Sequence, residues 1–398
     1  MAAPQSAATQ AASPPETAAR WRGAAWALWL IPLLVICITV VAKPANHSLT
    51  SLYHDAAARW WGRKLLYDGP SGMNYLPQFT LLFTLYYLLG QAVSDILWRC
   101  TAVAGLALGI LFFSGAPAGA DRPRAFFWVT LLAMPLCLQA LQFGQANAHL
   151  AAALLLAAWC LRTQRWWAAT LFLALATAIK PLGIAAVGLA WAAYPRLWWR
   201  LGLGLTALMI LPFAFGPPHY VWSQYLACAD NLRQCSAVTE HRFADLNGLL
   251  RTFHVALGSQ ASFLVRAAAG MLLMLLCWRA SRRQPEPLRA LVWLGATASF
   301  LMLFNPMTEA NSYAVIAPVL GLLAWWSFSH GQRAIGWTLA GMVLSMGLLP
   351  EPLRPLFGNS FALAWYPAMT LGFLGLLVWM AFSLPAAGGA LPGSHEQS

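Results

Sequence analysis

A carboxylate and two guanidinium groups recur at helical spacing near the N-terminus. Asp55, Arg59 and Arg63 are four residues apart, so they share one face of an amphipathic helix that we expect to lie on a membrane surface. A surface ion pair, stabilising by at most about 1 kcal/mol, explains this spacing. The alternative is an ionised carboxylate held beside cations that bind a phosphate. The spacing is compatible with both.

Polar residues also lie in the gaps between apolar runs. Gln145 and Asn147 stand between two runs, where amides either cap a helix or hydrogen-bond to sugar hydroxyls. Asn305, Glu309 and Tyr313 belong to one polar stretch, which a plain polar turn explains equally well. These positions are candidates for contacts with a polyhydroxyl compound.

Lys180 lies inside a long apolar run, and Tyr75 lies just before another one. A charge at bilayer depth is costly, so Lys180 is a functional candidate by default, with snorkelling to the interface as the alternative. The helix that begins after Pro181 offers free N–H groups to an anion. Tyr75 and Pro77 are typical of an interfacial aromatic anchor followed by a proline in the first helical turn.

The composition decides what kind of elements must position these residues. The 398 residues are 60% hydrophobic and 9% charged, with a formal net charge of +12. A soluble surface needs far more charge, and a nucleic-acid-binding protein needs its basic residues gathered in a folded patch. Here the Arg residues form short clusters between apolar runs, as in membrane proteins with several spans. A soluble enzyme, a nucleic-acid partner and a disordered chain are excluded.

The apolar runs predict an all-α membrane protein with twelve or thirteen membrane segments, because unpaired backbone is too costly in lipid. We expect disordered tails at 1–22 and 384–398 and a membrane domain over 23–383. The expected spans are 23–42, 76–92, 95–114, 125–141, 146–161, 166–194, 198–215, 262–279, 288–304, 311–328, 333–349 and 361–382. Pro181 interrupts the run 166–194, which is either one bent span or two short ones.

The basic loops predict the orientation. Arg279, Arg282, Arg283 and Arg289 fall in one short connection, which should be cytoplasmic. The loops 43–74 and 216–261 are then extracytoplasmic, provided that 166–194 counts once or another segment is only a half-span. The candidate residues at 55 and 309 would share the outer face.

Two cysteines share the second of these outer loops. Cys228 and Cys235 could close a short disulfide if that face is oxidising, and the sequence leaves this open. No Cys/His cluster has the spacing of a zinc site, so we predict no metal ligands; a need for a divalent cation stays open.

The order of these features resembles that of glycosyltransferase family 87, bacterial membrane enzymes of the GT-C fold that include mycobacterial polyprenyl-phosphate-mannose-dependent α-mannosyltransferases. The resemblance covers most of residues 24–382. It is carried by His54-Asp55 in the first outer loop, Tyr75-Leu76-Pro77-Gln78-Phe79 at the start of a span, Gly144-Gln145-Ala146-Asn147, Lys180-Pro181, and a late polar loop that ends at Tyr313.

The resemblance implies a GT-C-type bundle and an inverting transfer of a mannose-like hexose from a polyprenyl phosphate sugar. The acceptor would be an envelope glycan or glycolipid outside a bacterial plasma membrane, and no cofactor is firmly implied. Asp55 would be the general base, and Lys180, Arg59 and Arg63 would bind the donor phosphate. The expected substrate contacts are Tyr75, Gln145, Asn147, Asn305, Glu309 and Tyr313.

A transporter or lipid flippase is the competing interpretation, because many spans, an intramembrane Lys and Pro-broken helices also occur in transporters. Transporters of this size usually show internal repeats and acidic residues within spans. The sequence shows neither, and its long polar outer loops favour the transferase.

Overall fold

The structure is a computed structural model that describes residues 15–43, 48–115, 122–238 and 243–383. Every regular element in these ranges is a helix, and none of the ranges contains a β-strand. The expected all-α fold is therefore confirmed. The apolar runs form helices because a helix satisfies its backbone hydrogen bonds within one segment, which lipid requires.

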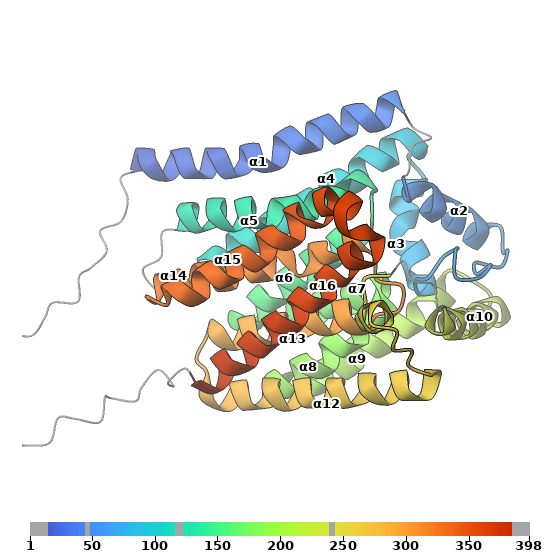
Figure 1. The fold of residues 1–398 in the computed structure, drawn as a ribbon. Coiled ribbons are helices and arrows are strands. Elements are labelled where there is room, and N and C mark those ends of the chain that lie inside the picture. The colour runs from blue at the N-terminus through green and yellow to red at the C-terminus, as the bar shows by residue number, and fades with distance from the viewer. Residues whose placement is uncertain (1–14, 44–47, 116–121, 239–242, 384–398) are drawn as a thin grey trace, which may run out of the picture.

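Within the described ranges, twelve apolar helices run between the two ends of a bundle (Figure 1). Seven are long and apolar enough to cross a membrane, two of them when their flanking 3-10 turns are included, and five are shorter. The chain is thus a polytopic membrane protein. In chain order the helices are α1 (Pro15–Ala42), α4 (Gln91–Ser114), α5 (Arg122–Gln142), α6 (Asn147–Arg162), α7 (Trp166–Ile179), α8 (Ile184–Ala193), α9 (Trp198–Ile210), α12 (Ser259–Arg283), α13 (Leu288–Phe304), α14 (Ala317–Ser329), α15 (Arg333–Leu348) and α16 (Pro350–Ser383).

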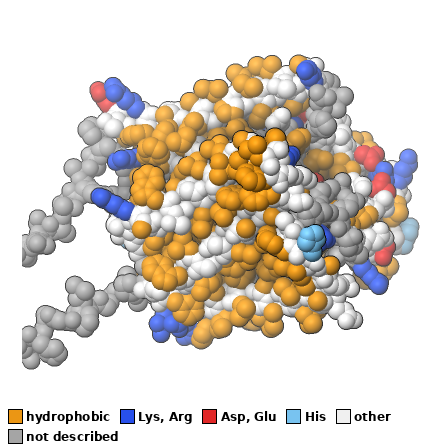
Figure 2. Space-filling model, in the orientation of Figure 1, with side chains coloured by type: hydrophobic (Ala, Val, Ile, Leu, Met, Phe, Trp, Pro, Cys, Tyr) orange, Lys and Arg blue, Asp and Glu red, His pale blue; other side chains and the backbone are white. Residues whose placement is uncertain are grey.

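The two ends of the bundle differ in charge. The arginine-rich end carries Arg20, Arg22, Arg122, Arg124, Arg162, Arg165, Arg196, Arg200, Arg279, Arg282, Arg283, Arg289 and Arg333. The opposite end, here called the loop end, carries α2 (Thr50–Trp61), α3 (Pro77–Tyr87), α10 (Pro218–Ala237) and α11 (Leu246–Thr252) (Figure 1). Figure 2 shows apolar side chains over the flank between the ends and most of the visible acidic side chains at the loop end.

The centre of the bundle consists of helices that are apolar all round. In α13 every residue except Arg289 is buried, and most of α6 and α14 is buried as well. The helices α1 and α12 lie at the periphery and expose large apolar side chains such as Leu34 and Phe263. Such faces are stable only against lipid, which agrees with a membrane location.

Glycines allow α4 and α6 to pack closely. A Cβ atom added at Gly105 would lie 2.8 Å from Cβ of Ala152, and one at Gly109 would lie 2.7 Å from Cβ of Leu155. Small residues at such crossings let two membrane helices approach each other. The close approach fixes the start of α6, which carries Asn147, relative to α4.

The expected span 76–92 does not cross the bundle. Its helical part, α3, has 11 residues, which is about 16 Å against the ~30 Å core of a bilayer. Tyr75 before α3 hydrogen-bonds to Tyr53 of α2, and Ser94 after it hydrogen-bonds to His54 of α2, so both ends of α3 lie at the loop end. The prediction was wrong because this short, partly buried helix is as apolar as a membrane span.

The run 166–194 forms two helices, which was one of the two alternatives. Lys180 is extended, with φ −135° and ψ 123°, and the chain reverses there. The ring of Trp166 at the start of α7 consequently lies 6.2 Å from the ring of Tyr194 just after α8. This added crossing compensates for the loss of α3, so the helices alternate in direction consistently along the described chain.

The two long loops at the loop end are largely helical. The first contains α2, as the spacing of Asp55 and Arg59 predicts, but Arg63 does not share its face, because α2 ends at Trp61 and Arg63 has φ +55°. The second was expected as a loop over 216–261, yet it contains α10 and α11. Two amides of α10 hold the stretch after α2: Leu66 N–H donates to Gln224 (3.0 Å), and Asn231 donates to the Met73 carbonyl (3.0 Å).

The first helix starts earlier than expected. Residues 15–22 were assigned to a disordered tail but belong to α1, which begins at Pro15. A proline at the first helical position and Glu16 in the first turn both favour a helix start. The remainder of that tail and the expected tail 384–398 lie outside the described residues.

Candidate active site

A cavity of about 550 Å³ lies at the loop end, within the size range of small-molecule sites. Its walls come from the start of α2, the turn before α3, the α5–α6 and α7–α8 connections, α10, α12 and the stretch before α14. It brings together six of the predicted site residues, which are Tyr75, Gln145, Asn147, Lys180, Asn305 and Glu309.

A buried ion pair holds three of the elements around this cavity. Arg99 and Asp95, both on α4, bind each other and are almost fully buried. Arg99 also donates to the carbonyls of Leu141 (2.9 Å) and Gln142 (2.8 Å), at the end of α5 where helix carbonyls lack partners. Asp95 accepts a hydrogen bond from Thr50 at the start of α2. The pair thus fixes α2 and the α5–α6 turn against α4.

The α5–α6 turn directs Gln145 and Asn147 into the cavity. Gly144 in this turn has φ +62°, and a Cβ atom there would lie 3.1 Å from the guanidinium of Arg99. Glycine suits both the left-handed backbone and the close approach. Trp98 Nε1 donates a hydrogen bond to the Gly144 carbonyl (2.9 Å), which further stabilises the turn.

Amides and one carboxylate form a hydrogen-bond network on one wall. Gln145 Nε2 donates to Glu309 Oε2 (2.9 Å), and Asn311 Nδ2 donates to the same oxygen (3.1 Å). Asn147 Nδ2 donates to Gln145 and to Ser312 Oγ (3.0 Å). Asn147 Oδ1 is buried and has no hydrogen-bond partner within the described chain. Because such an atom is costly to leave unpaired, it can accept a hydrogen bond from a ligand hydroxyl.

Lys180 reaches the cavity because a helix ends at this residue. The following proline disfavours helical backbone at Lys180, and the 3-10 turn Pro181–Gly183 follows at once. No described residue hydrogen-bonds to its ammonium group or forms an ion pair with it, although the side chain lines the cavity. The ammonium is therefore available to an anion.

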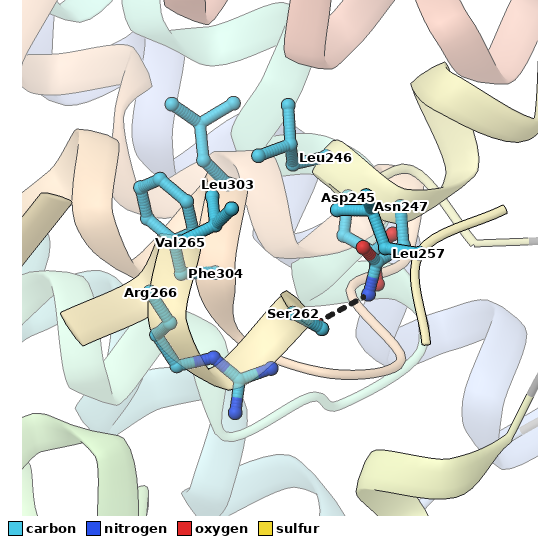
Figure 3. A pocket seen from close by; sticks show the side chains of 9 residues that line it. All are labelled: Asp245, Leu246, Asn247, Leu257, Ser262, Val265, Arg266, Leu303 and Phe304. Atoms are coloured by element: carbon cyan, nitrogen blue, oxygen red, sulfur yellow. Dashed lines mark hydrogen bonds between the residues drawn. The ribbon is translucent and has the colours of Figure 1, made fainter. Parts of the chain in front are cut away.

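Arg266 of α12 lines the same cavity and was not among the predicted site residues. It also lines a small neighbouring cavity with Asp245, Asn247 and Ser262, where Asn247 donates to Ser262 (3.2 Å; Figure 3). The signal that could have found it is the one that singled out Lys180, a lone charge inside an apolar run.

Asp245 lies near Arg266 but is used elsewhere. Its Oδ1 accepts the Gly248 N–H (2.7 Å) and caps α11. Burial raises the pKa of this carboxyl group, and the Gly248 N–H, Arg251 and Arg266 oppose that effect. Figure 3 shows no hydrogen bond between Arg266 and Asp245. The guanidinium of Arg266 thus has no ion-pair or hydrogen-bond partner among the residues that the structure describes.

Tyr75 and Asn305 line the cavity with side chains that are already hydrogen-bonded. The hydroxyl of Tyr75 meets that of Tyr53 at 3.0 Å. Burial and the neighbouring Tyr53 raise the pKa of Tyr75 well above its usual value, so this phenol stays neutral. Asn305 Nδ2 donates to Thr308 (3.2 Å) and to the Pro306 carbonyl (3.1 Å), which fits a polar turn.

Asp55 and Arg59 lie outside the set of residues that line the cavity. Arg59 bridges two carboxylates, with Asp55 at 2.6 Å and Asp68 at 3.1 Å. The bridge joins α2, which lines the cavity through Leu52, to the turn that lines it through Pro70. Asp55 itself does not line the cavity, although it follows the lining residue Leu52 by three positions on α2.

The other two predicted residues also lie outside the cavity. Arg63 donates to the Phe215 carbonyl (3.0 Å), and its guanidinium lies 5.5 Å from the ring centre of Tyr220. Tyr313 is fully buried and donates to the Ala244 carbonyl (2.8 Å). Both side chains join segments of the loop end to one another.

The possible disulfide between Cys228 and Cys235 does not form. Both cysteines are free and lie on α10. Seven residues along one helix correspond to roughly 10 Å at 1.5 Å per residue, beyond the ~7 Å limit for the Cα atoms of a disulfide. Of the two alternatives that the sequence left open, the helix over Pro218–Ala237 fits the free thiols.

The charged residues that line the cavity are two cations, Lys180 and Arg266, and one carboxylate, Glu309. Among the described residues, no three His, Cys, Asp or Glu side chains come together as a metal site. Chemically, this arrangement can hold an anion beside a group rich in hydroxyls.

Fold and site together define a polytopic membrane protein with a polar, net positive cavity at one end of its helix bundle. The chain belongs to glycosyltransferase family 87, whose model matches residues 74–306. The matched stretch includes Tyr75, Gln145, Asn147 and Lys180 and ends before Glu309. The protein is therefore a membrane glycosyltransferase, which acts on a sugar donor and an acceptor. No curated protein matches the chain.

Proposed function

We propose that this glycosyltransferase transfers a hexose from a polyprenyl phosphate sugar to an envelope glycan or glycolipid. The family resemblance suggests a mannose-like hexose. The observation that carries the proposal is the cavity itself. It combines unpartnered cations with the amide and carboxylate wall of Gln145, Asn147 and Glu309. A sugar phosphate needs both kinds of group, cations for its phosphate and amide or carboxylate groups for its hydroxyls.

A lipid-linked donor fits the position of the cavity in the molecule. The cavity lies at the ends of apolar helices, and apolar side chains such as Leu182 and Leu232 complete its walls. A polyprenyl chain is as apolar as the lipid around the bundle, so it can remain in the membrane while its head group enters the cavity. A nucleotide sugar has no apolar chain, so these apolar surroundings would not help to bind it.

The charge asymmetry supports an extracytoplasmic site. Short connections rich in Arg and Lys remain in the cytoplasm, and the arginine-rich end has such connections at Arg162–Arg165 and Arg279–Arg289. The cavity at the opposite end would then face the outside of a bacterial plasma membrane. That is also the side on which envelope glycans are assembled.

In the proposed reaction, Asp55 is the general base. It accepts the proton of the acceptor hydroxyl while that oxygen forms a bond to the anomeric carbon of the donor. The bond from the anomeric carbon to the phosphate oxygen breaks, and its electron pair leaves with the polyprenyl phosphate. Attack and departure on opposite faces invert the configuration. A phosphate is a good leaving group, so no general acid is required.

The geometry around Asp55 is compatible with this role. Asp55 follows the cavity-lining residue Leu52 by three positions on α2, and Arg59 holds its carboxylate in a defined orientation (2.6 Å). Arg59 and Arg63 are engaged with protein groups, so of the three cations predicted to bind the donor phosphate, Lys180 is the one whose ammonium is open to it. The proposed role requires the acceptor and the anomeric carbon to be brought to Asp55 when the substrates bind.

The test is mass spectrometry of the envelope glycolipids from cells with and without the gene. We expect loss of one glycosylated species and accumulation of its precursor, lighter by one hexose. Restoring the wild-type gene should reverse the change, and an Asp55→Asn gene should not. An unchanged glycolipid and glycan profile would contradict the proposal.

A further inference from the structure

We infer that Arg266 and Lys180 together bind the phosphate of the lipid-linked donor, as two cations on the wall of one cavity. The inference rests on the proposed function and deepens it, because it assigns the phosphate-binding residues and the charge of the donor.

The described cations at the loop end differ in their surroundings. Arg59, Arg63, Arg99 and Arg354 are engaged by carboxylates or carbonyls, and Lys64 and Arg233 are exposed. Lys180 and Arg266 line the cavity, and neither has a hydrogen-bond or ion-pair partner within the described part of the chain. An unpaired cation in a partly desolvated place is costly, so two of them lining one cavity indicate an anionic ligand.

Arg266 is left without a partner because its polar neighbours form hydrogen bonds with other groups. Asp245 is the carboxylate that acts on it electrostatically, but that group caps α11 through Gly248 (2.7 Å). Asn247 and Ser262, beside Arg266 in Figure 3, hydrogen-bond to each other. The guanidinium can therefore offer its planar N–H groups to phosphate oxygens, which it binds in pairs.

The second observation that points to a ligand is an unpaired hydrogen-bond acceptor, in contrast to the two unpaired cations. Asn147 is 5% exposed, and its Oδ1 atom is buried without a partner. This acceptor belongs to the hydrogen-bond network that joins Asn147, Gln145 and Glu309. A phosphate on Lys180 and Arg266 would leave the amide group of Asn147 to the sugar.

The net charge of the cavity favours one kind of donor. Two cations and Glu309 leave one positive charge among the lining residues. A sugar joined to a polyprenyl monophosphate carries one negative charge, and a diphosphate donor carries two. When the sugar leaves, the phosphate gains charge, and two cations stabilise it most at that moment.

The experiment measures binding of a long-chain polyprenyl phosphate to the purified full-length protein in detergent by microscale thermophoresis. The variants are Arg266→Gln, Arg266→Lys and Lys180→Gln. The matched control is Arg233→Gln, an exposed residue of α10 that does not line the cavity. All variants are first checked for wild-type melting temperatures, and Arg266→Lys serves if Arg266→Gln fails to fold.

We expect Arg266→Gln and Lys180→Gln each to raise the Kd about tenfold or more, as the loss of a hydrogen bond to a charged group should. Arg266→Lys should be intermediate, and Arg233→Gln should bind like the wild type. If Arg266→Gln binds normally while Lys180→Gln does not, the inference about Arg266 is overturned and the proposed function stands. If the wild type does not bind polyprenyl phosphate, both are overturned.

Inorganic phosphate distinguishes a lipid-linked phosphate from a free one. We expect it to bind far more weakly than the polyprenyl phosphate, because it lacks the apolar chain. Equal affinity for the two would overturn the assignment of a lipid-linked ligand. A polyprenyl diphosphate hexose that binds more tightly to the wild type than the polyprenyl monophosphate hexose would overturn the charge match.

Discussion

Lys180 and Arg59 are both basic residues at the loop end, but they differ in what surrounds them. Arg59 is held between two carboxylates at 2.6 and 3.1 Å, whereas no described residue pairs with Lys180. The difference could not be predicted, because Asp68 approaches Arg59 only through the turn after α2. Arg266 could have been predicted by weighing every charge inside an apolar run in the way Lys180 was weighed.

Replacement of Asp55 by Asn should lower the rate of sugar transfer about a hundredfold or more, the usual contribution of a general base. The amide has nearly the same shape but cannot accept the proton. Steady-state transfer by the purified variant measures the effect. Asp230→Asn on α10, also an exposed carboxylate of the loop end, is the matched control and should be fully active. Normal activity of the Asp55 variant would rule out its role as base.

The pair Arg99–Asp95 is structural, and its removal should act on stability. Asp95→Asn leaves a buried guanidinium without its carboxylate, a loss of about 3–5 kcal/mol. The double variant Asp95→Asn/Arg99→Met should lose less than the sum of the losses in Asp95→Asn and Arg99→Met alone, because no charge is left buried. Thermal unfolding in detergent gives the three values. Strictly additive losses would show that the two residues do not act as a pair.

At the scale of elements, the sequence predicts which segments are helical better than where they run. Most expected spans correspond to helices, because apolar runs in lipid have no other stable form. It could not predict that α3 stays at the end of the bundle, because apolar residues that face other helices, such as Phe79 and Phe83, look the same in the sequence as residues that face lipid. It also could not show that the chain reverses at Lys180, because a proline is compatible with a kink and with a turn.

The helix α10 was not predicted, for the opposite reason. It is amphipathic and too polar to register as a span, yet its amides hold the stretch after α2. Because 216–261 was taken as a loop, the sequence left a disulfide between Cys228 and Cys235 open, which the helix does not allow. Helices that pack on other loops have to be predicted from their capping residues and from the spacing of polar and apolar residues, because they contain no long apolar run.

The close contact of α4 and α6 should be sensitive to added volume. Gly109→Val would place a side chain within 2.7 Å of Leu155, and overpacking of this kind costs about 1–3 kcal/mol. We expect a lower melting temperature and weaker donor binding, because α6 positions Asn147. Gly202→Val on α9, where nothing lies within 4 Å, is the matched control. Equal stability of the two variants would contradict the packing described for α4 and α6.

At the scale of the whole molecule, the distribution of charge and the fold both separate an arginine-rich end from the loop end. The composition predicts a membrane protein with scattered basic loops, and the structure sorts those loops to one end and the cavity to the other. The predicted orientation required either that 166–194 count once or that another segment be only a half-span. The fold meets the second condition, since α7 and α8 cross separately and α3 does not cross.

The orientation can be tested with single introduced cysteines. Arg233→Cys on α10 lies at the loop end and Ala334→Cys on α15 at the arginine-rich end, and both positions are exposed. In intact cells a membrane-impermeant thiol reagent should label the first, and the second only after permeabilisation. Cys228, which is buried, gives no background at the loop end. The reverse labelling pattern would contradict an extracytoplasmic cavity.

The central claim is that the loop-end cavity transfers a sugar from a polyprenyl phosphate donor. The most direct measurement is transfer of radiolabelled hexose from a polyprenyl phosphate hexose to envelope lipids by the purified protein, beside nucleotide sugars as alternative donors. We predict transfer from the lipid-linked donor alone, lost in Lys180→Gln and kept in Arg233→Gln. Transfer from a nucleotide sugar, or undiminished transfer by Lys180→Gln, would contradict the account.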